Sequence, residues 1–267
     1  MTATPTFFTV LTPTYNRAGT LHRVYESLSR QTYRDFEWVI VDDGSTDNTH
    51  EAVLDWQQRA AFPIRYVWQN NQHKKTAFNR GVREARGELV VALDSDDEMP
   101  PEALATFKAA WDAIPPARRD SYVAITGLCA RPDGSIVGDR YPQDVFDSTA
   151  VDVYFRYRIK GEKFGCMRTD ILRKFPFPED VAGFVPRAWC GGRSRGPAIS
   201  AASSTRSCAL TTTPRAGSAR GLSRCTTTPR ACTCWPGTCC STTWNSSASG
   251  RANSSWPPRA TRASGCT

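Results

Sequence analysis

Two apolar runs in this chain each end abruptly in carboxylates. Residues 39–47 read Val-Ile-Val-Asp-Asp-Gly-Ser-Thr-Asp, and residues 89–97 read Leu-Val-Val-Ala-Leu-Asp-Ser-Asp-Asp. Each run has the composition of a buried strand. Ligands of open parallel sheets collect beyond the carboxyl ends of the strands, so acidic residues there are placed for binding rather than packing. Side by side, the two strand ends would form a site for a nucleotide and a metal ion.

The apolar runs alternate with segments of helical periodicity. The strand-like runs lie at residues 7–11, 38–41, 64–68 and 89–93, and the helix-like segments that follow them lie at 20–31, 48–58, 76–85 and 101–111. Four strand–helix units in series predict an α/β fold with a parallel, doubly wound sheet. After residue 116 the pattern weakens. The remaining strand-like runs are 122–128, 135–137 and 164–167, with a short helix expected at 169–174. We therefore expect a parallel or mixed central sheet with flanking helices.

The composition changes after residue 186. The segment 187–267 contains no Asp, Glu, Lys, His, Val, Phe or Tyr, but it holds eleven Arg and eight of the ten Cys. The segment 1–186 carries 23 basic and 26 acidic groups, so the net charge of +8 comes from the tail. A segment with so few large apolar residues cannot build a core. We predict an incomplete domain at 1–186 and an irregular, disordered tail at 187–267.

Codon usage offers an explanation for this tail. Nearly all of its residues are of types whose codons have G or C at the second position; the exceptions are Ile199, Leu210, Leu222, Asn245 and Asn253. Reading a G/C-rich gene out of frame would produce this composition, so we predict that the tail is a frameshift product.

Two alternatives would give the tail a function of its own. One is an Arg-rich arm that binds nucleic acid, and the other is a zinc site at Cys232, Cys234, Cys239 and Cys240. The tail lacks Lys and any RNA-binding motif, and its Cys spacing matches no common zinc site. We therefore expect neither.

The chain shows no sign of a membrane span or a secretory signal. No run of eighteen apolar residues occurs, and the N-terminus has no basic segment followed by an apolar one. Only Cys129 and Cys166 precede the tail, which suits a reducing compartment. We expect a protein without a transmembrane segment, located in the cytoplasm or at the inner face of the membrane.

The segment Asp94-Ser95-Asp96 is the candidate metal site. Mg²⁺ and Mn²⁺ prefer oxygen ligands and bind one or two carboxylates together with substrate phosphates. We expect one of the two carboxylates to face a nucleoside and the other to face the metal. The alternative is a solvated acidic turn, because an isolated Asp-x-Asp is common.

Residues at two other predicted strand ends are candidates for binding a nucleotide. The carboxylates of Asp42 and Asp43 can accept hydrogen bonds from a base N–H or a ribose hydroxyl, or they can cap the next helix. In the run from Thr12 through Pro13 to Arg17, Tyr15 can lie against a planar base and Thr12 can bond it, unless this is only a loop.

A polar group of side chains precedes the third predicted helix or lies near its start. These are Lys74, Lys75, Asn79 and Arg80. Positive charge at a helix start suits a diphosphate. The alternative is a solvated helical face.

Together these motifs resemble family 2 glycosyltransferases, which are inverting enzymes with the GT-A fold. The resemblance covers residues 7–111 closely and continues more faintly to about residue 186. It includes Thr-Pro-Thr-Tyr-Asn-Arg at 12–17, Gln-Thr-Tyr-Arg-Asp-Phe-Glu at 31–37, Lys-Lys-Thr-Ala-Phe-Asn at 74–79, and Gly87-Glu88 ahead of the second acidic run.

The resemblance implies roles for individual residues. Thr12, Tyr15 and Asp43 would contact the base, Asp94 would serve the ribose side, and Asp96 would bind the metal on the diphosphate. A nucleotide-diphosphate sugar, most commonly a UDP-sugar, would be the donor. The acceptor is unknown, and a glycan or a lipid-linked molecule is expected.

The catalytic base of such enzymes comes from an acidic motif after the second group of strands, where Glu179 and Asp180 are the acidic pair. Relatives carry a motif that resembles Phe-Val-Pro-Glu a few residues later, whereas in this chain Arg187 follows Phe184-Val185-Pro186. The alternative to an active transferase is therefore a catalytically dead, truncated or frameshifted product that at most binds a nucleotide sugar.

Overall fold

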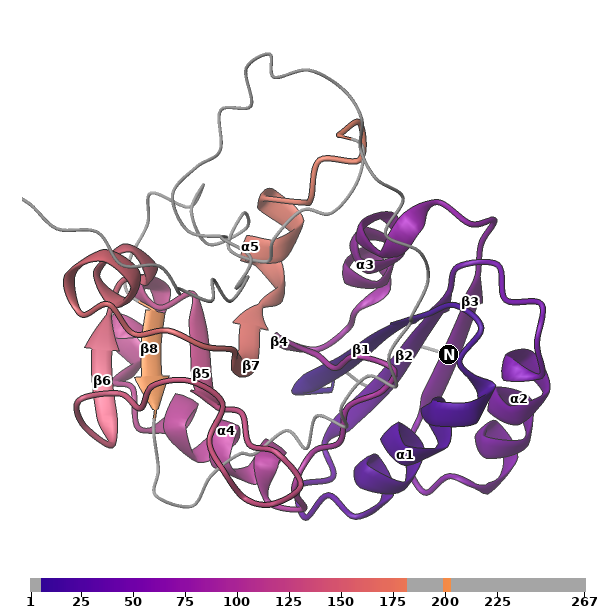
Figure 1. The fold of residues 1–267 in the computed structure, drawn as a ribbon, viewed down its shortest axis with the longest axis horizontal. Helices are drawn as coiled ribbons and strands as arrows, with labels where there is room; N and C mark the ends of the chain where they lie inside the picture. The colour runs from indigo at the N-terminus through magenta and orange to yellow at the C-terminus, as the bar shows by residue number, and fades with distance from the viewer. Residues whose placement is uncertain (1–5, 182–198, 203–267) are drawn as a thin grey trace, which may run out of the picture. The chain divides into compact units, whose positions relative to one another are not determined.

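The computed structural model describes residues 6–181 and 199–202. In these ranges the strands form one sheet in the order β3-β2-β1-β4-β7-β5-β8-β6 (Figure 1). The bounds of the strands are β1 Phe8–Thr14, β2 Phe36–Asp42, β3 Ile64–Trp68, β4 Leu89–Ala92, β5 Ala124–Leu128, β6 Val145–Ser148, β7 Lys163–Arg168 and β8 Ile199–Ala202. The bounds of the helices are α1 Ala18–Ser29, α2 Thr49–Arg59, α3 His73–Glu84, α4 Ala103–Asp112 and α5 Thr169–Lys174, with a 3-10 helix η1 at Pro116–Ser121 and a π-helix η2 at Asp152–Arg156.

The first half of the sheet is parallel, as the sequence predicted. β1 pairs with β2 and β4, and β2 pairs with β3, all in parallel. The predicted strand–helix order is confirmed for all four units, with boundaries that differ by a few residues. β1 is longer than predicted and runs through Pro13 to Thr14, because its register with β2 continues to Asp42.

The second half makes the sheet mixed. β7 is antiparallel to both β4 and β5. The predicted strand at 135–137 is wrong, because this segment contributes only an isolated antiparallel bridge between Ala130 and Ile136. β6 was not predicted, and β8 lies inside the tail that was expected to be irregular; its backbone pairs with β5 and β6. The rest of the predicted disordered tail lies outside the described residues.

Side chains alternate between the two faces of the parallel strands. Trp38 and Ile40 of β2 belong to the core under α1, α2 and α4, whereas Val39 and Val41 belong to the core under α3 and α5. Figure 1 shows α1, α2 and α4 on one side of the sheet and α3 and α5 on the other. Burial on both faces explains why these strands read as continuous apolar runs.

Two glycines allow close packing around β1. A Cβ atom at Gly81 of α3 would lie 2.1 Å from the Leu11 side chain, and one at Gly87 would lie 2.4 Å from the backbone nitrogen of Thr9. The α3 helix can therefore press directly against β1. Within the described residues, no helix reaches the length and hydrophobicity needed to cross a bilayer.

Candidate functional site

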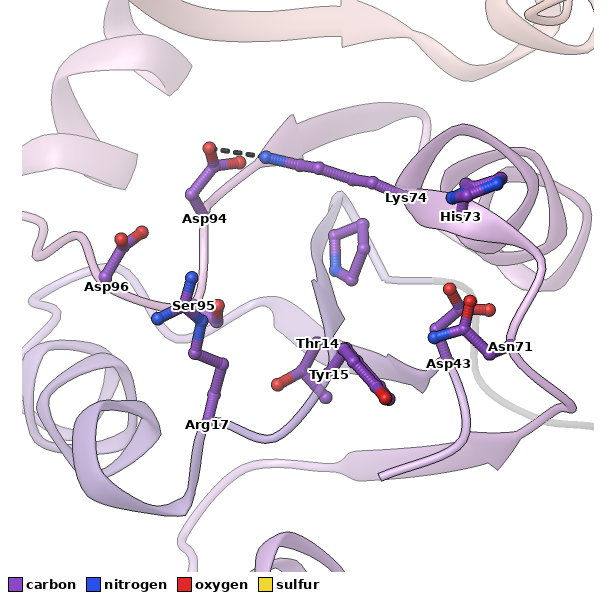
Figure 2. A pocket seen from close by; sticks show the side chains of 11 residues that line it. Thr14, Tyr15, Arg17, Asp43, Asn71, His73, Lys74, Asp94, Ser95 and Asp96 are labelled. Carbon is purple, nitrogen blue, oxygen red and sulfur yellow. Dashed lines mark hydrogen bonds and ion pairs between the residues drawn. The ribbon is translucent and has the colours of Figure 1, made fainter. Parts of the chain in front are cut away.

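A cavity of about 380 Å³ lies beyond the carboxyl ends of β1, β2 and β4 (Figure 2). Its walls come from four segments that are far apart in the sequence. The lining residues are Pro13, Thr14, Tyr15, Arg17, Asp43, Asn71, His73, Lys74, Asp94, Ser95 and Asp96. The site therefore forms where the parallel-sheet rule places it, at the ends of neighbouring strands.

The structure brings together eight of the fifteen predicted site residues. These are Pro13, Tyr15, Arg17, Asp43, Lys74, Asp94, Ser95 and Asp96. The other seven do not line the cavity, namely Thr12, Asp42, Lys75, Asn79, Arg80, Glu179 and Asp180.

The end of β1 divides its side chains between the core and the cavity. Thr12 is fully buried, and its hydroxyl accepts a hydrogen bond from the indole Nε1 of Trp38 at 3.0 Å. Tyr15, in contrast, is 48% exposed at the cavity wall. The next residue, Asn16, adopts a positive φ of 52°, and its Oδ1 accepts a hydrogen bond from the Thr46 backbone at 2.8 Å. This bond ties the loop after β1 to the loop after β2.

The two adjacent carboxylates after β2 have different surroundings. Asp42 is fully buried and accepts hydrogen bonds from the Ser45 backbone at 2.7 Å and from the Tyr66 hydroxyl at 2.5 Å. Burial and this bond to Asp42 raise the pKa of Tyr66. Asp43 lines the cavity, and its Oδ1 accepts from Gln69 Nε2 at 2.7 Å and from the Gln72 backbone at 2.9 Å. Asp42 thus fixes the turn, while Asp43 is oriented at the cavity.

A nearby carboxylate holds the start of α1. Asp47 accepts hydrogen bonds from the backbone of Ala18 at 3.0 Å and from the Thr49 hydroxyl at 2.5 Å. Burial alone would raise the pKa of Asp47, but the hydrogen bonds from Thr49 and Ala18 outweigh it and lower that pKa. The sequence motif at residues 42–47 therefore contains both cavity-lining and scaffold carboxylates.

The opposite wall of the cavity is acidic. Carboxylate oxygens of Asp94, Asp96 and Asp97 lie within 4.8 Å of one another. A cluster of hard oxygen donors at this spacing suits a divalent cation such as Mg²⁺ or Mn²⁺. Asp97 was not among the predicted ligands, although it is part of the acidic run that the sequence analysis singled out.

The start of α3 reaches across the cavity to this cluster. Lys74 Nζ donates to Asp94 Oδ2 at 2.6 Å, which Figure 2 shows as a dashed line. His73, the first residue of α3, has a positive φ of 72°. Figure 2 also shows Asn71 beside Asp43, away from Asp94 and Asp96. Asn71 and His73 were missed because their loop carries no motif, although its position after β3 was a usable signal.

The other residues of α3 that the sequence predicted for the site do not line the cavity. Lys75 is only 9% exposed and does not line the cavity. Asn79 is 3% exposed, and its side chain bonds both backbone groups of Phe177 at 2.9 Å. Its Nδ2 also donates to Glu179 Oε1 at 2.9 Å. Asn79 therefore fastens the segment after α5 to α3.

The predicted acidic pair, Glu179 and Asp180, belongs to the segment that Asn79 holds against α3. Glu179 Oε1 is also 3.7 Å from Arg83 Nη1, so two side chains of α3 hold its carboxylate. Asp180 is exposed and follows directly. Of the two, Asp180 is the carboxylate for which no hydrogen bond or ion pair with another described residue is seen.

Comparison with known proteins places these features in one family. A family model described as Glycosyl transferase family 2 matches residues 9–169. An uncharacterized glycosyltransferase of Nostoc sp. is 43% identical over 95 residues, which are 36% of this chain and 30% of that protein. The GalNAc(5)-diNAcBac-PP-undecaprenol beta-1,3-glucosyltransferase of Campylobacter jejuni is 25% identical over 185 residues, which are 67% of this chain and 57% of that protein. The chain thus spans less than two thirds of these relatives.

A solved structure has the same fold. The crystal structure of S. aureus TarS 1-349 in complex with UDP-GlcNAc superposes with a TM-score of 0.59 at 24% identity, covering 79% of this chain and 59% of that one. The predicted GT-A architecture is confirmed by this likeness, and the family match extends over more than half of the 267 residues. The chain therefore belongs to glycosyltransferase family 2.

Proposed function

We propose that this chain binds a nucleotide-diphosphate sugar in the cavity and transfers the sugar to an acceptor hydroxyl with inversion. The observation that carries the proposal is that Asp43 lines the same cavity as Asp94 and Asp96, which form a cluster of carboxylates with Asp97. A nucleotide sugar needs a hydrogen-bond acceptor for its base and a cation near its diphosphate. Asp43 would supply the acceptor, and the cluster would supply oxygen ligands for the cation.

The base would lie near Asp43 and Asn71, with Tyr15 against its ring. Asp43 is held by Gln69 and by the Gln72 backbone, so its orientation is fixed before the ligand arrives. A fixed acceptor loses little freedom on binding. A UDP-sugar is our choice of donor, because the TarS structure that shares this fold is a complex with UDP-GlcNAc.

The diphosphate would lie toward Asp94, Asp96 and Asp97. These residues would hold Mg²⁺ or Mn²⁺, with Asp96 as the main ligand, and the ion would offset the charge of the leaving diphosphate. Lys74 and Arg17 also line the cavity and bring positive charge to it. Lys74 now pairs with Asp94, so a bound donor would compete with that ion pair.

Transfer would be a single displacement. The acceptor oxygen attacks the anomeric carbon as the bond from that carbon to the diphosphate oxygen breaks, and a carboxylate takes the hydroxyl proton. Asp180 is our candidate for this base rather than Glu179, whose carboxylate is engaged by Asn79 and Arg83. Asp180 does not line the cavity, so this assignment rests on the family resemblance and on the absence of a partner for Asp180 among the described residues. We propose an acceptor of the glycan or lipid-linked class, met in the cytoplasm or at the inner membrane face.

The second candidate is a product that binds the donor but cannot transfer sugar. It is supported by Arg187, which stands where the family resemblance implies Glu, and by the composition of residues 187–267. A frameshifted tail would account for both. Restoring the alternative reading frame after codon 186 should then yield a chain that transfers sugar, and a nucleotide sequence with no open alternative frame would refute the frameshift.

Calorimetric titration of UDP, with and without Mn²⁺, tests donor binding. We expect metal-dependent binding that Asp96→Ala weakens by at least tenfold, or about 1.4 kcal/mol. Asp55→Ala is the matched control, because Asp55 is an exposed carboxylate on α2 that pairs with Arg59. Equal affinity in Asp96→Ala and the wild type would contradict the proposed metal site.

A transfer assay with Asp180→Asn and Glu179→Gln tests the base. If Asp180 accepts the proton, Asp180→Asn loses transfer while UDP binding is retained, and Glu179→Gln keeps most of its activity. If the wild-type chain binds UDP but transfers nothing, the second candidate holds.

A further inference from the structure

An exposed aromatic and basic segment lies at the far end of the sheet from the parallel strands. Residues 151–160 read Val-Asp-Val-Tyr-Phe-Arg-Tyr-Arg-Ile-Lys and include η2. We call this the aromatic–basic segment. Tyr154 is 53% exposed, Phe155 61% and Tyr157 40%, and Val151 is 60% exposed at its start. Large apolar side chains gathered on a surface mark interaction sites.

The segment is held firmly from its inner side. Ile159 and Val153 pack in a small core with Leu128, Tyr141 and Phe146. The Ile159 backbone nitrogen donates to the carbonyl of Val153 at 3.0 Å, closing the loop around η2. Val153 and Ile159 fill the inner positions, and the Tyr157 ring packs edge-on against Phe146 of the same core at 4.9 Å. Tyr154 and Phe155, between these inner residues, are more than half exposed.

Positive charge accompanies the aromatic rings. Arg156, Arg158 and Lys160 are exposed, and among the described residues none of the three forms an ion pair. The single acidic residue of the segment, Asp152, accepts a hydrogen bond from Thr149 instead. The segment thus carries a net charge of +2, whereas the whole stretch 1–186 carries −3.

We infer that the aromatic–basic segment docks on an anionic lipid surface. Aromatic side chains favour the boundary between headgroups and acyl chains, and basic side chains near it are attracted to anionic lipids. Val151 and Phe155 add aliphatic and aromatic surface without any polar group, which suits the acyl boundary. This surface is separate from the donor cavity, because no residue of the aromatic–basic segment lines that cavity.

The arrangement of the rings favours lipid over a sugar chain. The rings of Tyr154 and Phe155 are 4.9 Å apart but inclined at 79°, so they do not form a flat platform on which sugar rings could stack. Arg156 lies over the face of Tyr157 at 5.4 Å and covers it. Separately oriented rings can still enter a lipid boundary, because insertion does not need coplanar faces.

Vesicle sedimentation of the full chain tests the inference. We expect binding to vesicles that contain phosphatidylglycerol in phosphatidylcholine, and much weaker binding to pure phosphatidylcholine. Replacing Arg156 and Arg158 by Glu should weaken it at least tenfold, since each basic group near an anionic surface contributes about fivefold. Replacing Tyr154 and Phe155 by Ser should weaken it to a similar degree.

The matched control replaces Leu54 and Trp68 by Ser. These side chains are 44% and 51% exposed and belong to α2 and β3, away from the segment. Vesicle binding should be unchanged in this control. The melting temperature and UDP affinity of every variant should match the wild type, so that loss of lipid binding is separable from misfolding and from failure of the donor site.

Amide hydrogen exchange locates the contact, because the eleven arginines of residues 187–267 could bind anionic vesicles themselves. We expect vesicles to slow exchange in residues 151–160. Slowed exchange outside this segment alone, or undiminished vesicle binding in both segment variants, overturns the inference. Segment-dependent binding to a lipid-free glycan or to a second copy of the chain, without vesicle binding, overturns it as well.

Discussion

Substituting Asn79 tests whether a polar residue near the site stabilises the fold or binds the donor. The Asn79 side chain makes three hydrogen bonds of 2.9 Å, two to the backbone of Phe177 and one to Glu179. Asn79→Ala removes all three. Phe177 is 6% exposed, so its backbone N–H and C=O would lose these partners while shielded from water.

The expected cost follows from these two groups. A buried donor or acceptor that loses its partner costs roughly 1–3 kcal/mol. Glu179 adds little, because it is exposed and keeps Arg83. We therefore expect Asn79→Ala to lower the free energy of unfolding by about 2–4 kcal/mol. Urea denaturation followed by circular dichroism measures this loss, and UDP titration at low temperature measures the affinity of the folded fraction.

Asn71→Ala is the matched control for Asn79→Ala. Asn71 is exposed and lines the cavity, so its loss should change the unfolding free energy by no more than about 0.5 kcal/mol. UDP affinity should fall in Asn71→Ala and stay within a factor of about two in Asn79→Ala. If Asn79→Ala keeps its stability but loses UDP binding, the reasoning from the structure is refuted and Asn79 is a donor ligand.

Three further predictions concern the scaffold. Glu37 is 1% exposed and accepts hydrogen bonds from the Thr9 hydroxyl and the Arg86 backbone at 2.8 Å, and it lies 3.5 Å from Arg65, which also pairs with Glu84. Glu37→Gln should lower the unfolding free energy in urea by about 1–3 kcal/mol, and an unchanged value would contradict this. Gly81→Ala would place a Cβ atom 2.1 Å from the Leu11 side chain, and we expect a loss of about 1–3 kcal/mol, whereas unchanged thermal stability would show that Leu11 moves freely. The folded-state pKa of Asp47 lies below its ordinary 3.8, so the ionised carboxylate stabilises the fold above that value and this stabilisation is lost as the pH falls through the folded pKa. The difference in unfolding free energy between the wild type and Asp47→Asn should therefore shrink in acid, and a pH-independent difference would contradict this.

The parallel half of the fold was predictable because one rule governs it. Strands buried on both faces must be apolar throughout, and the helices between them must each bury one stripe. Trp38 and Val39 go to opposite faces, yet both are apolar, so the run stands out in the sequence. β6 was not predicted because it is short and because an exposed Val145 and a buried Ser148 break the apolar–polar alternation of a half-buried strand. A short edge strand of this kind has no composition that distinguishes it from a loop.

The location of the site was also predictable, but the role of each polar residue was not. Asp42 and Asp43 are adjacent and of one type, yet only Asp43 lines the cavity. The difference depends on Tyr66 and Ser45, which satisfy Asp42 internally. The Ser45 backbone is a local partner three residues on, but Tyr66 lies on β3, and no local pattern reveals that contact.

The same principle explains why acidic and amide residues serve two purposes around this sheet. A ligand site at strand ends needs loops that hold their shape without the ligand, and each loop therefore needs buried polar anchors of its own. Asp42 and Asp47 anchor the loops after β1 and β2, whereas Asp43 lines the cavity. Anchors and ligands must lie close together in sequence, because each anchor positions the residues beside it. Substituting an anchor should therefore lower stability first, and substituting a cavity residue should lower affinity first.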